Sequence, residues 1–122
     1  MRAFKTRTFR RWAEKTGVSD TALLEAVAQI EGGLIDADLG GNIFKQRVAL
    51  PGRGKSGSTR TLIATRFAGV LFFIFGFEKS ERDNISTKEL QLYQRFAREL
   101  LGLTSDQLAT ALTRQVLMEV KR

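Results

Sequence analysis

The spacing of apolar residues changes at Asn42, and this change restricts the folds open to the chain. Before Asn42 the apolar side chains recur every three or four residues, and after it they alternate with polar ones. The first pattern is typical of amphipathic helices and the second of half-buried strands. Residues 70–77 are apolar on both faces, which favours a central strand covered on both sides. The sequence therefore predicts an α+β fold built around this strand.

Four helices are predicted, two before the strands and two after them. The first two, over about 6–16 and 19–31, are separated by Gly17 and form an N-terminal helical hairpin. The last two are expected to run from about 86 to 102 and from about 104 to 114. Two capping boxes mark where they begin: Ser86 with Glu89, and Thr104 with Gln107.

Three strands are predicted from the alternating pattern: residues 43–50, 59–67 and 70–77. Residues 2–6 can also pair as a strand, and residues 116–120 fit a last strand or an extended arm. Sequential hairpins imply a small, mainly antiparallel sheet of three to five strands, with the helices packed on one side. Residues 34–41 are expected to be an irregular connector. A chain of 122 residues is expected to form a single domain over residues 1–122.

The chain is basic, and its cations are concentrated where the first two strands meet. Its 20 Lys and Arg residues outnumber 13 Asp and Glu residues, which gives a net charge of +7 and indicates a polyanionic partner, either nucleic acid or an acidic protein. The segment 44–60 holds five cations and no acid: Lys45, Arg47, Arg53, Lys55 and Arg60. A glycine-rich loop between the strands would hold Arg53 and Lys55 at the rim of the sheet, where phosphate is the natural ligand.

Several common chemistries are excluded by the residues that this chain has. It contains neither Cys nor His, which removes disulfides, thiolate zinc sites and the usual general base near neutral pH. The sequence GKS at 54–56 is not a phosphate-binding P-loop, because Ala49 stands where that motif needs Gly and a strand follows. Asp36 and Asp38 have calcium-loop spacing but lack further oxygen ligands, so a solvated turn is expected. No metal and no cofactor are expected.

A second charged segment, residues 76–84, follows the central strand. It carries Glu78, Lys79, Glu81 and Arg82, which would lie at the rim of the sheet and could face the loop at Arg53. Metal-free cleavage of RNA is the chemistry that such groups suit. RNA supplies its own nucleophile, the 2′-OH, so the protein must only orient it, move protons and stabilise charge on the phosphorane. The other reading is a surface salt-bridge set that caps the following helix.

The segments 31–64 (EGGLIDADLGGNIFKQRVALPGRGKSGSTRTLIA) and 73–86 (FIFGFEKSERDNIS) carry a family resemblance. The chain resembles the RelE-like ribonuclease toxins of type II toxin–antitoxin systems, within the RelE/ParE superfamily and close to its HigB-like members. The resemblance implies a RelE-like fold and a metal-independent endoribonuclease that cuts mRNA, often on the ribosome, and inhibits translation. It also implies a cognate antitoxin, commonly a helix-turn-helix protein, as partner.

The resemblance and, for Lys45 and Arg47, the charge pattern of the first strand suggest residue roles. Four residues are expected at the catalytic centre: Lys55, Arg60, Lys79 and Glu81. Four more are expected to bind RNA: Lys45, Arg47, Arg53 and Arg82. Arg60 would contact the scissile phosphate. The chain departs from family members that use His or a late Tyr as acid or base, since it has no His and Tyr93 is expected in the core.

Other functions remain open from the sequence alone. A DNA-reading helix-turn-helix is disfavoured, because the helix over 19–31 carries Glu25 and Glu31 and no Lys or Arg. A non-catalytic member of the same fold, which binds nucleic acid or a protein target such as gyrase, is the main alternative; a structural basic protein is the third. The first fifteen residues have no apolar signal-peptide core, and the run 70–75 is too short to cross a membrane, so a cytoplasmic protein is expected.

Overall fold

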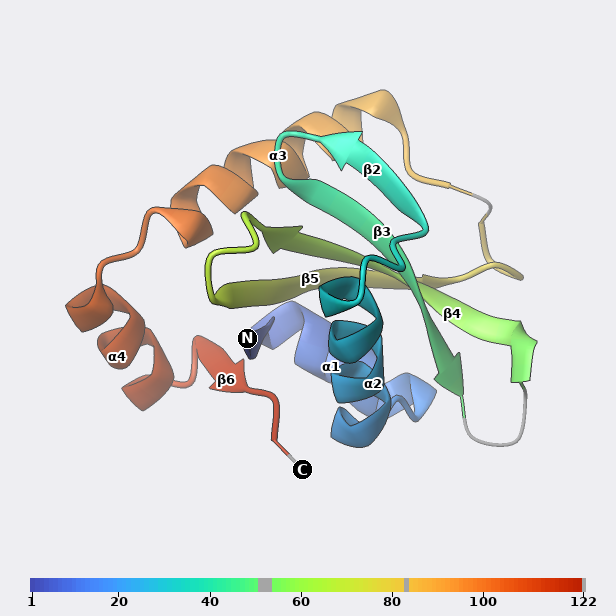
Figure 1. The fold of residues 1–122 in the computed structure, drawn as a ribbon, viewed down its shortest axis with the longest axis horizontal. Helices are drawn as coiled ribbons and strands as arrows, with labels where there is room; N and C mark the ends of the chain where they lie inside the picture. The colour runs from blue at the N-terminus through green and yellow to red at the C-terminus, as the bar shows by residue number, and fades with distance from the viewer. Residues whose placement is uncertain (51–53, 83, 122) are drawn as a thin grey trace.

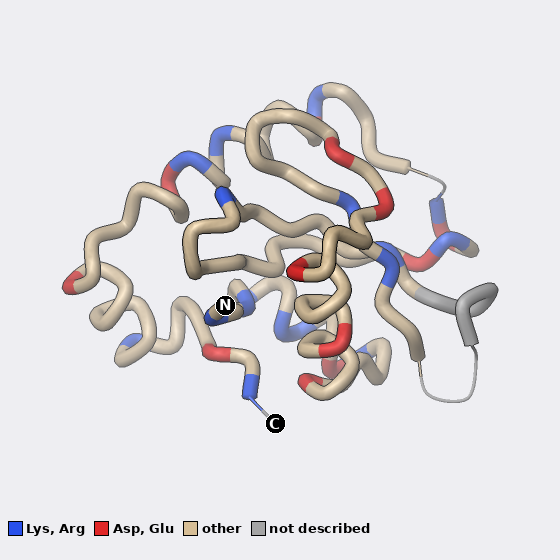
Figure 2. The backbone as a smooth tube through the Cα atoms, viewed as in Figure 1, with Lys and Arg blue, Asp and Glu red and all other residues tan. Residues whose placement is uncertain are grey.

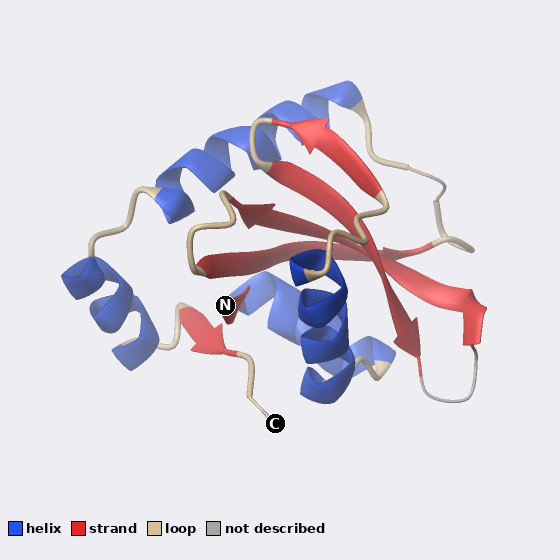
Figure 3. Cartoon of the chain, in the orientation of Figure 1, coloured by secondary structure: helices blue, strands red, loops and turns tan. Residues whose placement is uncertain are grey.

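The computed structural model describes residues 1–50, 54–82 and 84–121, and shows one sheet between two layers of helices (Figures 1 and 3). Its elements in chain order are β1 Arg2–Thr6, α1 Arg7–Thr16, α2 Asp20–Glu31, β2 Ala37–Gly40, β3 Ile43–Leu50, β4 Gly54–Thr65, β5 Val70–Glu78, α3 Thr87–Leu101, α4 Ser105–Thr113 and β6 Leu117–Glu119.

The sheet has the strand order β2-β3-β4-β5-β1-β6. Neighbouring strands are antiparallel except β1 and β5, which are parallel. The long β3–β4–β5 meander brings Arg47 opposite Arg60, and Arg60 opposite Phe77. A register shift between Leu62 and Ile63 marks a bulge on this meander, and bulges bend and twist the strand that carries them.

The first two helices cover one face of the sheet, which we call the α1–α2 face. The side chains of Thr6 and Ser19 accept the backbone N–H of Phe9 and of Ala22, which caps the start of each helix. Gly17 ends α1 at a φ of 89°, in the left-handed region that glycine adopts at little cost. The buried apolar residues of both helices pack on inward side chains of β3, β4 and β5.

The last two helices cover the other face, which we call the α3–α4 face. Both predicted capping boxes are present, Ser86 with Glu89 at α3 and Thr104 with Gln107 at α4. The helices pack on a second apolar cluster, whose sheet residues include the following buried side chains: Phe4, Ile43, Leu62, Ala64, Phe72 and Ile74. Burial on both faces explains why β5 has no charged residue before Glu78.

The structure corrects four features of the predicted fold. The described residues form six strands rather than three to five, and β1 makes the sheet mixed. Helices lie on both faces rather than on one. The connector over 34–41 contains β2, which the three positive-φ residues Gly40, Gly41 and Asn42 turn back onto β3. The second strand of the meander begins at Gly54 instead of residue 59, because the ladder with β3 continues to the pair Leu50–Gly54.

Candidate nucleic-acid interface

Three predicted site residues lie side by side on the α3–α4 face of the sheet. Side chains alternate along a strand, so Lys45 and Arg47 share the face of buried Ile43, and Arg60 shares the face of buried Leu62. Arg47 and Arg60 are directly paired across β3 and β4. Figure 2 shows Lys and Arg positions of β3, β4 and the segment after β5 gathered toward the end of the sheet that lies away from α4.

These cations line a shallow open hollow, which we call the cationic depression. Its described lining consists of Asp36, Lys45, Arg47 and Arg60, and its volume is about 300 Å³. Lys45 and Arg60 are half-buried and Arg47 is exposed, so solvent and a large ligand both reach the hollow. An open, cation-lined surface of this kind suits the phosphates of a nucleic acid backbone.

Asp36 is the residue in the depression that the sequence did not predict. One oxygen of its carboxylate accepts the backbone N–H of Arg47 at 2.6 Å, and the same oxygen lies 3.4 Å from the Arg47 Nε. The pair therefore fixes the position of Arg47 and offsets part of its charge. The sequence predicts a solvated turn at Asp36, but the residue directly precedes β2 and binds Arg47. No local signal could predict this contact, because it depends on the pairing of β2 with β3.

The other predicted site residues in the loop and the turn do not line the cationic depression as far as the structure describes them. Arg53 lies outside the described residues, and Lys55 belongs to β4 but its side chain is not described. Lys79 and Glu81 are exposed in the turn after β5, and neither lines the cationic depression. The backbone of this turn begins beside β4, since Glu78 pairs with Thr59. The two charged segments thus meet at one end of the sheet at the level of the backbone.

Arg82 is held by the start of α3. Its guanidinium donates to both carboxylate oxygens of Glu89 and to the carbonyl oxygen of Asn84, and it lies 5.9 Å and 5.8 Å from the ring centres of Phe75 and Phe77. The hydrogen bond from Arg82, followed by the backbone N–H of Ser86, lowers the pKa of Glu89 to about 2. For Arg82, these contacts agree with the alternative reading of the sequence, in which the charged segment after the central strand caps the following helix.

Tyr93 packs as the sequence predicts. Its ring lies 5.1 Å from that of Phe75, centre to centre, and the side chain joins the apolar cluster under α3 and α4. Burial is the main cause that raises the pKa of its hydroxyl, and the nearby Glu89 adds to it while Arg82 opposes it. A phenol in this setting stays protonated at neutral pH.

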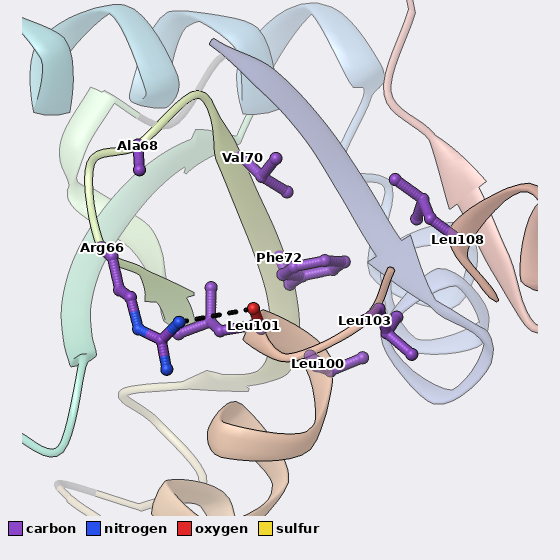
Figure 4. Close-up of a pocket in the computed structure, with 8 residues that line it drawn as sticks. All are labelled: Arg66, Ala68, Val70, Phe72, Leu100, Leu101, Leu103 and Leu108. Atoms are coloured by element: carbon purple, nitrogen blue, oxygen red, sulfur yellow. Dashed lines mark hydrogen bonds between the residues drawn. The ribbon is translucent and has the colours of Figure 1, made fainter. Parts of the chain in front are cut away.

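Another hollow on this face is apolar and lies at the opposite end of β4 and β5. It holds about 120 Å³ beneath the end of α3 (Figure 4). Val70, Phe72 and Leu108 are among its lining residues, and Arg66 closes its rim by donating to the carbonyl oxygen of Leu101 at 3.4 Å. Its small size and apolar lining do not suit a phosphate. The cationic depression is the candidate interface because three cations line it.

The described residues contain neither a candidate metal site nor a candidate membrane-spanning helix. Across 1–50, 54–82 and 84–121, no three acidic side chains are grouped so that they could hold a metal ion. None of the helices in this part of the chain has the length and apolar character needed to cross a membrane.

Comparison with known proteins agrees with the predicted resemblance. A search of curated proteins found no match. The model of the RelE toxin family, described as the RelE toxin of the RelE/RelB toxin–antitoxin system, matches residues 1–120. This span includes every strand and helix of the structure and the whole cationic depression. The chain therefore belongs to the RelE toxin family.

Proposed function

We propose that this protein is the toxin of a type II toxin–antitoxin system, and that it inhibits translation as a cytoplasmic, metal-independent endoribonuclease that cuts mRNA on the ribosome. Membership of the RelE family supports the toxin role. The cationic depression supports an RNA substrate, because Lys45, Arg47 and Arg60 project from the same face of two paired strands and line one open hollow.

The observation that carries this proposal is the direct pairing of Arg47 with Arg60 across two strands. Like charges opposite each other on neighbouring strands destabilise a sheet. Asp36 already offsets part of the Arg47 charge. A phosphate bound beside the two guanidinium groups would add to this effect, since guanidinium groups bind phosphate with paired hydrogen bonds. The half-buried Lys45 lies on the same face and would add a third positive charge to the same anion path.

The proposed reaction is attack of an RNA 2′-OH on its adjacent phosphate, with departure of the 5′ oxygen. Arg60 would stabilise the negative charge that builds on the phosphorane, while Lys45 and Arg47 hold the RNA backbone in place. Lys55, Lys79 and Glu81 would complete the catalytic centre, with none of them singled out as the general base or the general acid. Arg53 and Arg82 would bind RNA outside the depression.

Toxins of this kind must be restrained, so we also propose a cognate antitoxin, a helix-turn-helix protein, as the physiological partner. The net charge of +7 favours association with an acidic segment as well as with RNA.

The test is to compare the wild-type protein with Arg60→Ala in translating extracts and in cells that express it without an antitoxin. The substitution should lower mRNA cleavage by about 10²–10³-fold, the cost typical of one lost charge-stabilising donor, and should restore growth. Arg11→Ala is the matched control, because Arg11 is exposed on α1. Altered DNA supercoiling with intact mRNA would instead support the non-catalytic alternative, and no effect on either would refute both.

A further inference from the structure

A second hollow adjoins the cationic depression, and we propose that it binds a nucleobase of the RNA, with guanine preferred. This inference rests on the proposed function, since the base would belong to the RNA whose phosphate binds in the cationic depression. The hollow has a volume of about 320 Å³, within the range of small-ligand pockets. The lining residues that bear on the argument are Gln29, Leu34, Asp36, Gln46, Arg47 and Ala49.

The two hollows share one wall. Asp36 and Arg47 line both of them, so a single ion-paired couple separates the cation-lined space from the second one. A base and the phosphate of the same or the next nucleotide are joined through one ribose. We therefore infer that the adjacent hollows hold one nucleotide, with its phosphate at Arg47 and its base beyond Asp36.

The shared wall is held by a buried hydrogen-bond network. Gln46 is 2% exposed, and its amide nitrogen donates to the carbonyl oxygen of Leu34 at 3.0 Å and to the Gln29 side-chain oxygen at 3.2 Å. Its amide oxygen accepts the backbone N–H of Asp36 at 3.1 Å. One buried side chain thus satisfies all the polar groups of its own amide and fixes the backbone on both sides of residue 35. This part of the wall is therefore held in place without a ligand.

The lining has the chemistry of a base site. Leu34 is 68% exposed, so its apolar side chain is accessible to the flat face of a base. Asp36 offers only acceptors, and a carboxylate has room for more bonds than the two or three it makes to Arg47. The Watson–Crick edge of guanine presents two neighbouring N–H donors to such a carboxylate, whereas adenine places an acceptor there. Single-stranded RNA is read through these edges.

The experiment is a titration of the ¹⁵N-labelled protein with GMP, AMP and ribose 5-phosphate, followed by NMR. GMP should shift the backbone signals of Gly33, Leu34 and Arg47, whereas ribose 5-phosphate should shift those around the cationic depression alone. Leu34→Ala should weaken GMP binding about tenfold, because apolar area that the base buries is lost, and leave ribose 5-phosphate binding unchanged. Leu92→Ala, which removes a leucine that is 57% exposed on α3, is the matched control.

Base preference is tested separately. Asp36→Asn removes a negative charge and should strengthen the binding of every phosphate, so the informative quantity is the ratio of GMP to AMP affinity, which should fall toward one. Asp38→Asn is the control two residues away, where the carboxylate bonds to the Gly40 N–H.

Equal affinities for GMP and ribose 5-phosphate, with no shift at Gly33 or Leu34, would overturn the base site while leaving the phosphate site in place. If none of the three compounds binds, the base site is also overturned. The proposed ribonuclease function is judged independently, by whether the wild-type protein cleaves mRNA.

Discussion

The α3–α4 face of the sheet has two halves that differ in what covers them. In one half, Ile43 and Leu62 are fully buried beneath the C-terminal helices. Two residues along the same strands, Lys45 and Arg60 point from the same face and line an open depression. On each strand, only two residues therefore separate the buried core from the candidate RNA site. The rigid core half holds the cations of the open half in fixed positions.

The comparison predicts that stability and activity separate between the halves. Side chains of the covered half should matter for folding, and those of the open half for binding RNA. Each of the following changes tests one side of this division.

The largest effect on stability is expected from Phe72→Ala in the covered half. Phe72 is 2% exposed, and its ring stacks on Phe4 at 5.6 Å between centres. Its removal leaves a cavity between the sheet and α3–α4 and should cost about 3–5 kcal/mol of unfolding free energy. Lys45→Ala in the open half should cost less than about 0.5 kcal/mol. Urea denaturation followed by the fluorescence of the single Trp12 measures both, and similar losses would contradict the division.

A smaller effect, on binding, is expected from the same Lys45→Ala variant. Each phosphate that a cation neutralises on single-stranded RNA contributes about −0.7 to the slope of log affinity against log salt concentration. Loss of Lys45 should therefore flatten this slope by about 0.7 for an unstructured RNA. Lys15→Ala, a change of equal charge at the exposed end of α1, should leave it as in the wild-type protein. An equal change in both variants would mean that only net charge matters.

The local elements were predictable because their signals lie close together in the sequence. Both capping boxes and the strand alternation that puts Lys45 and Arg47 on one face needed only neighbouring residues, and the structure confirms them. The strand β2 was missed since Ala37–Gly40 has little strand character of its own and forms by pairing with β3. The parallel pairing of β1 with β5, and with it the coverage of both faces, depends on contacts between distant segments.

In the candidate site, too, some features could be predicted from neighbouring residues and others depend on contacts between distant segments. The shared face of Lys45 and Arg47 followed from alternation, but the pairing of Arg47 with Arg60 required the register of the β3–β4 hairpin, whose second strand begins five residues before its predicted start. Asp36 entered the site only because β2 folds back on β3 and a buried Gln46 holds the chain before it. Buried polar contacts between segments ten or more residues apart leave no local pattern.

Two arginine–carboxylate pairs sharpen the comparison further. Arg47 and Asp36 stand in the open half, where Arg47 remains available to a ligand from one side. Arg82 and Glu89 join the turn after β5 to the first turn of α3, and Glu89 also accepts the Ser86 backbone N–H as part of the capping box. The Arg82–Glu89 pair is therefore expected to stabilise the fold, and this contribution should be lost when acid protonates Glu89.

The smallest effect, and the most specific, is the pH dependence of this second pair. Because the pKa of Glu89 is lowered from 4.5 to about 2 in the folded protein, the stability that its charge contributes is complete above about pH 4.5 and is lost as the pH falls toward 2. Glu89→Ala should therefore lower the melting temperature at pH 7 by more than at pH 3. The capping box of α4 supplies the control, since its Gln107 is neutral and Gln107→Ala should cost the same at both pH values. A loss from Glu89→Ala that does not shrink in acid would show that its hydrogen bonds matter without its charge, and would place the Arg82 pair among the surface contacts that contribute little.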